Sequence, residues 1–254
     1  MFLKKMGGLS AALLFFIICA GVAPHEARAA AGEYALKGDQ VYRLVKGRMK
    51  LLEDVSIEKA DTNAGPWAWF LADPEVPGLK GTKLGLRFFR GKEGKPAGFL
   101  PMEEGASSFC RVTFSPSGDK LLVSWGGLPV KHLFLYFIDK NKGFAEKASF
   151  ETAEPPFWID NDRFAFSTVD SDKGPRVEGK FDLWWSSIKL YDCETGKTTV
   201  VRKATATKNY ALNGCDREAG ALDITESSVK NAKDWEDEDK IDDKELSVPV
   251  PAAR

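Results

Sequence analysis

Few side chains in this 254-residue chain have a type and spacing that indicate catalysis. His132 is one of two histidines, and a lone imidazole acts as a general base only with an orienting partner; a structural histidine is the alternative. The sequence contains no Gly-x-Ser-x-Gly, His-Glu-x-x-His, P-loop or Cys-x-x-Cys pattern. Paired carboxylates can hydrolyse glycosides, but 37 acidic residues give no basis for choosing a pair. We therefore assign no catalytic residue and favour a non-enzymatic role.

The main candidate for a metal site is an acidic run near the C-terminus, because Ca²⁺ takes oxygen ligands. Its acids are Asp234, Glu236, Asp237, Glu238, Asp239, Asp242, Asp243 and Glu245. The run lacks the alternating ligands and central glycine of an EF-hand loop, and Lys240 and Lys244 dilute its charge. We predict no metal and no cofactor, and we expect residues 234–245 to form a solvated, mobile segment.

The first 29 residues have the features of a removable export signal. Lys4 and Lys5 precede the mostly apolar run Gly7–Ala23, and Ala-Arg-Ala at residues 27–29 supplies a small-x-small cleavage pattern. The apolar run is shorter than the roughly 20 residues that a membrane-spanning helix needs. We therefore predict cleavage, with an uncleaved anchor as the alternative, and a soluble protein in the periplasm or outside the cell.

Cleavage after residue 29 changes the composition on which function must be argued. It leaves 225 residues with 33 basic and 36 acidic side chains, a net charge of −3, and His132 as the single histidine. This balance argues against nucleic-acid binding and against a histidine-rich metal site. No other segment is apolar enough to span a membrane.

Export also permits disulfide bonds. Three cysteines remain after cleavage: Cys110, Cys193 and Cys215. The pair Cys193–Cys215 closes the shortest loop and is the first candidate for a disulfide, whereas three unpaired, half-buried cysteines are the alternative.

Turn residues flanked by apolar residues predict a β-hairpin over Phe114–Trp125. In its turn, Ser115–Asp119, proline fixes φ, glycine accepts a positive φ, and serine and aspartate bond nearby backbone. The next strand, Leu133–Ile138, is apolar at every position, so both of its faces must be covered. The same order recurs with a hairpin over Trp158–Phe166, whose tip is Asp160–Asp162.

Further strands are expected at Val41–Val45, Met49–Leu52, Trp67–Leu71, Leu84–Phe89, Ile188–Asp192 and Thr198–Val201. The inner-strand markers Trp69, Phe114 and Trp158 are 45 and 44 residues apart. The outer-turn glycines Gly47, Gly94, Gly143 and Gly196 are 47, 49 and 53 residues apart. Both series fall near the roughly 40–50 residues of a four-stranded propeller blade.

The segment from Phe114 to Val123, followed by an aromatic strand and a glycine turn, resembles the repeat of TolB-like and WD40-like β-propellers. Leu190–Gly196 resembles their outer strand and turn. The resemblance covers about residues 107–203 and implies a fold, whereas propellers host enzymes, lectins and scaffolds alike.

We predict an all-β fold for residues 30–254, a single β-propeller-like domain of about five four-stranded blades, with a β-sandwich as the alternative. The last blade would take Tyr210–Leu212 and Leu222–Thr225 as its inner hairpin. Ring closure would use either the hairpin Val41–Leu52 or the strand Glu245–Val250.

A binding face is expected where loops join the second and third strands of neighbouring blades, at residues 126–131 and 170–180. The candidate partner-binding residues are Leu128, Lys131, His132, Asp170, Asp172, Lys173, Arg176, Trp184 and Trp185. Adjacent tryptophans in a strand point to opposite faces, and tryptophan and arginine dominate binding hot spots. The alternative is an ordinary long loop over two core tryptophans.

The leading functional hypothesis is an exported binding or scaffold protein whose partner is an envelope protein or a peptide. The alternative is a glycan-binding lectin or a small glycoside-active enzyme on the same fold, in which tryptophans would stack on sugar rings.

Overall fold

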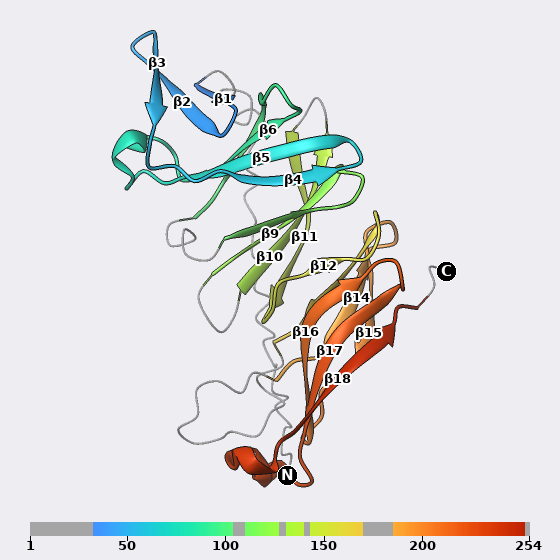
Figure 1. Ribbon diagram of the computed structural model, residues 1–254. Coiled ribbons are helices and arrows are strands. Elements are labelled where there is room, and N and C mark those ends of the chain that lie inside the picture. Colours follow the sequence, from blue (N-terminus) through green and yellow to red (C-terminus); the bar gives the residue numbers. More distant parts are fainter. Residues whose placement is uncertain (1–32, 104–109, 127–130, 140–142, 170–184, 252–254) are drawn as a thin grey trace, which may run out of the picture.

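The computed structural model describes residues 33–103, 110–126, 131–139, 143–169 and 185–251. Its strands form five antiparallel sheets that follow one another along the chain and along the molecule (Figure 1). We name them sheets A to E. Sheets B, C and D have four strands, and sheets A and E have three.

The strand bounds are as follows. Sheet A contains β1 (Tyr34–Lys37), β2 (Gln40–Val45) and β3 (Arg48–Leu52), and sheet B contains β4 (Glu58–Thr62), β5 (Gly65–Ala72), β6 (Gly85–Arg90) and β7 (Lys95–Pro101). Sheet C contains β8 (Arg111–Phe114), β9 (Lys120–Trp125), β10 (Lys131–Asp139) and β11 (Gly143–Thr152). Sheet D contains β12 (Phe157–Trp158), β13 (Arg163–Ser167), β14 (Ile188–Asp192) and β15 (Lys197–Arg202). Sheet E contains β16 (Lys208–Asp216), β17 (Ala221–Ser228) and β18 (Asp242–Pro249).

The prediction of an all-β, propeller-like fold with about five blades is confirmed. Within sheets B to E the first strands of neighbouring sheets contact one another, as the innermost strands of propeller blades do. The predicted hairpin Val41–Leu52 does not close the ring, however. It pairs with β1 in sheet A, and sheets A and E lie at opposite ends of the molecule (Figure 1). The alternative closing strand, Glu245–Val250, corresponds to β18, which pairs with β17.

Hydrophobic side chains form a separate core at each contact between neighbouring sheets. The strand β10 shows why: Leu133 and Leu135 pack with Trp158 and Phe164 of sheet D, whereas Tyr136 packs in the cluster that joins sheets B and C. A third cluster joins sheets A and B, and a fourth joins sheets D and E. The expectation that both faces of the Leu133–Ile138 strand are covered is confirmed.

The repeat length was predicted correctly, but one of its markers was assigned to the wrong strand. Phe114 and Trp158 end the first strands of their sheets, whereas Trp69 lies on β5, the second strand of sheet B. The first strand, β4, has the sequence Glu-Lys-Ala-Asp-Thr and is mostly exposed. It has no apolar alternation, so hydrophobic pattern alone does not reveal it.

The acidic segment near the C-terminus is ordered, which contradicts the prediction of a mobile segment. Residues Ala232–Glu236 and Glu238–Lys240 form two 3-10 turns, η3 and η4, and β18 starts at Asp242. The side chains of Asn231 and Asp234 cap the first turn reciprocally, and Trp235 is fully buried. Burial of this one indole anchors a segment most of whose charged side chains remain exposed. In the part of the chain that the structure describes, no helix is long and apolar enough to cross a membrane.

The proposed Cys193–Cys215 disulfide is wrong, because Cys110, Cys193 and Cys215 are all free thiols. Cys193 packs with the core between sheets C and D, and Cys215 packs with the core between sheets D and E. Cys193 and Cys215 are close in the sequence, but the stacking of the sheets places them in different cores. Burial raises the pKa of Cys110 and of Cys193 to about 12.

The tips of the first hairpins interlock from sheet to sheet. The amide of Asn63 in sheet B donates to the carbonyl of Pro116 in sheet C (2.8 Å), and the amide of Ser117 donates to Asn161 Oδ1 in sheet D (2.8 Å). Arg217 Nε of sheet E donates to the carbonyl of Trp158 (2.9 Å). We call this end of the sheets the turn face. The opposite end carries the connections between second and third strands and is called the loop face.

Gly118 is the tightest point of this interlock. Its φ is +71°, and a Cβ atom there would lie 2.4 Å from Thr62 Oγ1 of sheet B. Gly220 has a similar φ of +62°, but a Cβ atom there would meet no other atom within 4 Å.

We predict that Gly220→Ala lowers the free energy of unfolding by about 1 kcal/mol through backbone strain, and that Gly118→Ala lowers it by at least about 1 kcal/mol more. Urea unfolding measures both, and equal losses would contradict a close contact between sheets B and C.

Candidate functional site

The start of β10 carries two of the described residues of the predicted binding face, Lys131 and His132. His132 lies directly opposite Trp125 in the β9–β10 pairing, and the Trp125 and Phe134 rings stack at 4.3 Å with an interplanar angle of 12°. His132 is exposed, Lys131 and Phe134 are half-buried, and Trp125 is buried. The His132 imidazole lies on the same face of β10 as Phe134, with the two ring centres 6.4 Å apart, whereas Lys131, its neighbour in the strand, points to the opposite face. Within the described residues, no hydrogen bond orients the His132 imidazole as a general base would require.

A second part of the loop face is built around two buried indoles from different sheets. Trp185, just before β14, and Trp235 of η3 meet edge to face at 4.9 Å. Their Nε1 groups donate to the carbonyls of Thr205 (2.8 Å) and Ala206 (2.9 Å). The two tryptophans thus hold the same connection between β15 and β16. Every polar atom of these rings has a partner, which is the condition for burying an indole without penalty.

Short hydrogen bonds fix the chain beside these tryptophans. Ser186 Oγ donates to the carbonyl of Thr168 (2.6 Å), and its amide donates to Asn209 Oδ1 (2.7 Å). Ser187 Oγ accepts from the amide of Ala204 (3.0 Å). The adjacent serines therefore tie the ends of β13 and β14 together, and the Ser186 amide links sheet D to Asn209 of sheet E, so their role is positional.

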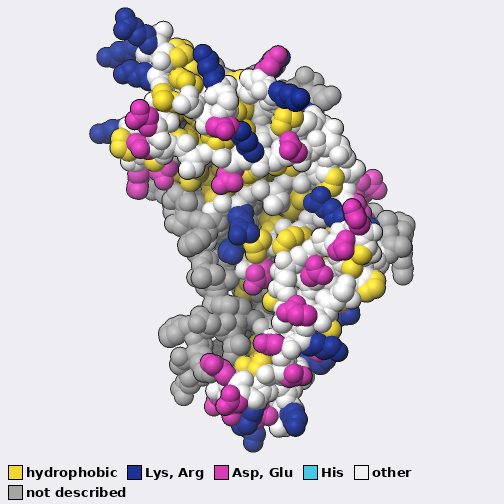
Figure 2. Space-filling model, viewed as in Figure 1, with side chains coloured by type: hydrophobic (Ala, Val, Ile, Leu, Met, Phe, Trp, Pro, Cys, Tyr) yellow, Lys and Arg dark blue, Asp and Glu magenta, His cyan; other side chains and the backbone are white. Residues whose placement is uncertain are grey.

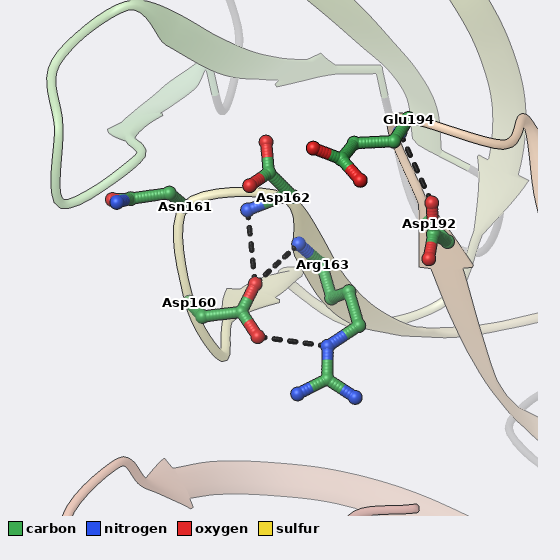
Figure 3. Close-up of a pocket in the computed structure, with 6 residues that line it drawn as sticks. All are labelled: Asp160, Asn161, Asp162, Arg163, Asp192 and Glu194. Carbon is green, nitrogen blue, oxygen red and sulfur yellow. Dashed lines mark hydrogen bonds and ion pairs between the residues drawn. The ribbon is translucent and has the colours of Figure 1, made fainter. Parts of the chain in front are cut away.

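The turn face contains an acidic depression of about 200 Å³ between the β12–β13 and β14–β15 turns (Figure 3). It is lined by Asp160, Asn161, Asp162, Arg163, Asp192 and Glu194. The carboxylates of Asp162 and Glu194 face the same space (Figure 3). Asp160 is turned away from it: Oδ1 accepts from the amides of Asp162 (2.9 Å) and Arg163 (2.7 Å), and Oδ2 accepts from Arg163 Nε (2.7 Å).

Most charges in this depression already serve the contacts between sheets. Lys120 of sheet C is 7% exposed, and its Nζ pairs with Asp162 Oδ1 (2.9 Å) and Asp119 Oδ2 (3.3 Å). Burial alone would lower the pKa of Lys120, but its bonds to Asp162 and Asp119 raise it. Arg163 Nη1 reaches the carbonyl of Pro251 beyond sheet E (2.6 Å). The depression is therefore a junction of three sheets rather than a free acidic site.

In the described ranges, no group of three or more His, Cys, Asp or Glu residues could hold a metal ion. Asp192 shows how the acids are used instead. Its Oδ1 accepts from the amides of Glu194 (3.0 Å) and Thr195 (2.8 Å), and the bond from Thr195 is the main reason that the pKa of Asp192 is lowered. These carboxylates close turns.

The structure places three of the nine predicted binding residues. Lys131 and His132 lie at the loop face, as expected for residues that begin β10 there. Trp185 is 1% exposed, so its assignment as a surface anchor was wrong: its indole fills the contact between the ends of sheets D and E. The other six lie outside the described residues, and their role stays a prediction: Leu128, Asp170, Asp172, Lys173, Arg176 and Trp184.

Sequence reasoning missed Trp235 and Lys120. Trp235 stands in an acidic run, and the Asn-x-x-Asp spacing of its capping residues was the available signal for an ordered turn. Lys120 looks like an ordinary strand residue beside a turn, and its partner Asp162 comes from another sheet. No local pattern could have revealed that pair.

No family model matches this chain, and no curated protein matches it. Among solved structures, the chain is similar to KlAtg21 in its complex with the coiled-coil of AgAtg16, with 12% identity and a TM-score of 0.41 over 78% of this chain and 63% of that chain. It is also similar to the Kuenenia stuttgartiensis hydrazine synthase (12% identity, TM-score 0.40, 76% and 51%) and to TolB from Acinetobacter baumannii (10% identity, TM-score 0.36, 74% and 45%). The chain thus spans 45% to 63% of these structures. At such scores, none of them indicates what it binds.

Trp185 should affect folding rather than binding. We predict that Trp185→Ala lowers the free energy of unfolding by about 3–5 kcal/mol, because a buried indole is replaced by a cavity. Trp185→Phe should cost less, since it keeps an aromatic ring against Trp235 and loses the bond to Thr205 and only part of the indole volume. Urea unfolding tests this, with the exposed His132→Ala as a control expected within about 0.5 kcal/mol of the unmodified protein. A Trp185→Ala variant of unchanged stability would disprove the buried position.

The Lys120–Asp162 pair gives a second prediction. Lys120→Met should lower the free energy of unfolding by about 1–3 kcal/mol, because Asp119 and Asp162 lose their shared cation. Adding Asp162→Asn should recover part of this loss, which a double-mutant cycle measures. The contribution is present at neutral pH. It should fade in base as the pH passes the raised pKa of Lys120, and in acid as the pH passes the pKa of Asp119, which hydrogen bonds from Ser117 and Lys120 lower despite burial. Additive losses in the cycle would exclude the pair.

Proposed function

We propose that this chain is an exported, non-enzymatic binding or scaffold protein that engages an envelope protein or a peptide through its loop face. The observation that carries the proposal is the exposed His132 imidazole beside the Trp125–Phe134 stack, with the half-buried Lys131 next to it in β10. Polar groups held on a rigid aromatic base bind at low entropic cost, because little has to be ordered on contact. Export rests on the N-terminal signal pattern, which lies outside the described residues.

The packing of the sheets supports a scaffold role. Hydrogen bonds at the turn face and buried cores between sheets hold the ends of β9, β10 and β14 in fixed positions. Sites on rigid elements keep their geometry better than sites on isolated loops. The loop face can therefore present side chains from several sheets to one partner.

The glycan-binding alternative is not favoured by the described residues. It requires an exposed tryptophan on which a sugar ring can stack. Six tryptophans are described, and each of them is at most 8% exposed: Trp67, Trp69, Trp125, Trp158, Trp185 and Trp235. The seventh, Trp184, lies outside the described residues.

The experiment is a photo-crosslinking capture from envelope extract, followed by affinity measurement with the identified partner. A photoreactive residue at position 132 should crosslink the partner, whereas one at position 194 on the turn face should not. Lys131→Ala with His132→Ala should weaken binding by about tenfold, since truncating contact residues at an interface commonly costs about 1–2 kcal/mol in total.

The matched control is Asn161→Ala with Glu194→Ala, which removes the same number of polar side chains from the turn face. It should leave the affinity unchanged. Binding that is insensitive to Lys131 and His132, or that is lost with the turn-face pair, would assign the partner to another surface.

A further inference from the structure

A buried arginine lies at the seam between sheets A and B. Arg87 of β6 is 6% exposed and shares a face of its strand with Phe89, which packs against sheet A. Its Cζ lies 3.8 Å from the ring centre of Phe99 and 4.9 Å from that of Tyr34. Cation–π contacts offset part of the cost of burying a guanidinium. Hydrogen-bond acceptors must offset the remaining cost of burying the guanidinium, because arginine stays charged at neutral pH.

Several donors in this seam have no acceptor. The Nε and Nη1 atoms of Arg87 are buried without a hydrogen-bond partner. The hydroxyl oxygens of Tyr34 and Thr82 are buried beside each other, near enough for Thr82 to lower the pKa of Tyr34, but neither makes a hydrogen bond of good geometry. Burial raises the pKa of Tyr34, and the neighbouring Arg87 and Thr82 offset this only in part, so the phenol keeps its proton. Native structures leave few buried polar groups unpaired. Here they come from β1, β6 and the segment before β6, and they share one seam.

The charges of the seam do not balance. Glu33 is the acid that acts electrostatically on Arg87, but its carboxylate accepts from Arg43 Nε at 2.8 Å. Arg43 Nη1 also donates to the carbonyls of Gly78 and Lys80, both at 3.3 Å. Among the described residues, no carboxylate lies within 4.0 Å of Arg87. Two guanidinium groups therefore share one carboxylate, which leaves the seam with a net positive charge.

We propose that Arg87, Tyr34 and Thr82 form a binding site for a small anion between sheets A and B. The donor set determines the class of ligand: guanidinium N–H groups and two hydroxyls require an acceptor that carries negative charge. Two aromatic rings flank the guanidinium, so the ligand must be small, of the class of chloride, acetate or phosphate. The bound anion links β1 to β6 and so fastens the terminal sheet to its neighbour. This site is distinct from the loop face.

The test measures stability against the concentration of each anion. Urea unfolding is followed at constant ionic strength and pH while sodium gluconate, whose anion is bulky, is replaced by sodium acetate, chloride or phosphate. A ligand that binds only the folded state raises the folded-to-unfolded ratio by 1 + [L]/Kd, about tenfold at ten times Kd. At least one of the three small anions should produce such a saturating rise.

Arg87→Met keeps a long apolar side chain beside Phe99 and Tyr34 and removes the charge, so it should abolish the rise. The matched control is Arg90→Met on the same strand. Arg90 also lies over an aromatic ring, 5.2 Å from the centre of Trp67, but it is half-buried and should leave the rise intact. General salting effects of phosphate persist in both variants and are subtracted by this comparison.

Tyr34→Phe and Thr82→Val each remove one hydroxyl and preserve shape, and each should increase the apparent Kd several-fold. They keep the test decisive if Arg87→Met does not fold. The proposal is overturned if no small anion stabilises the protein relative to gluconate, in which case the donors are satisfied by water. It is also overturned if Arg87→Met and Arg90→Met lose the effect equally.

Discussion

The interior sheets of this protein are apolar on both faces, and the rest of the structure follows from that constraint. A sheet such as β8–β11 cannot bury Leu133, Leu135 and Tyr136 by itself, so it is stable only between two neighbours. Each contact between sheets therefore becomes a core, and the stack is a series of such cores. The ends of the stack meet this constraint differently. The outer side of sheet E presents polar side chains such as Asp223 and Glu245, whereas sheet A exposes Leu44, Met49 and Leu51 beside basic side chains at the upper end of Figure 2.

Polar interactions set the register of the stack, because apolar surfaces alone let sheets slide. At the turn face, backbone and side-chain bonds run from Asn63 to Pro116 and from Ser117 to Asn161, and the Lys120–Asp162 pair adds charge to the same ladder. At the loop face, Trp185 and Trp235 donate to consecutive carbonyls of one connection. Both devices use directional bonds at the edges of hydrophobic cores, and because Lys120, Trp185 and Trp235 are buried, a misplaced sheet would leave these donors unpaired. The acidic depression of the turn face is a by-product of this arrangement.

The same physics separates positions that serve the fold from positions free to serve function. Tryptophan and arginine are the usual anchors of binding surfaces, yet every described tryptophan is buried, and Arg87 sits inside a seam. Residue type alone therefore misleads here. What distinguishes Lys131 and His132 is that they are accessible while the residues beneath them are fixed. Arg87, in contrast, is buried, and its Nε and Nη1 atoms lack the hydrogen-bond partners that buried polar atoms usually have.

The amino-acid sequence by itself determined the all-β class, the repeat of about five blades, and the position of most hairpins, because turn residues and alternating apolar residues act locally. It located Ser115–Asp119, Asp160–Asp162 and the glycine turns correctly for that reason. It missed β4, whose residues carry no apolar pattern, and it misjudged the order of residues 234–245 and the pairing of Cys193 with Cys215. Those outcomes depend on what neighbouring sheets place against a side chain. Burial of Trp185 and Trp235, the Lys120–Asp162 pair and the unpartnered donors around Arg87 arise between segments far apart in the chain, so only the tertiary structure decided them.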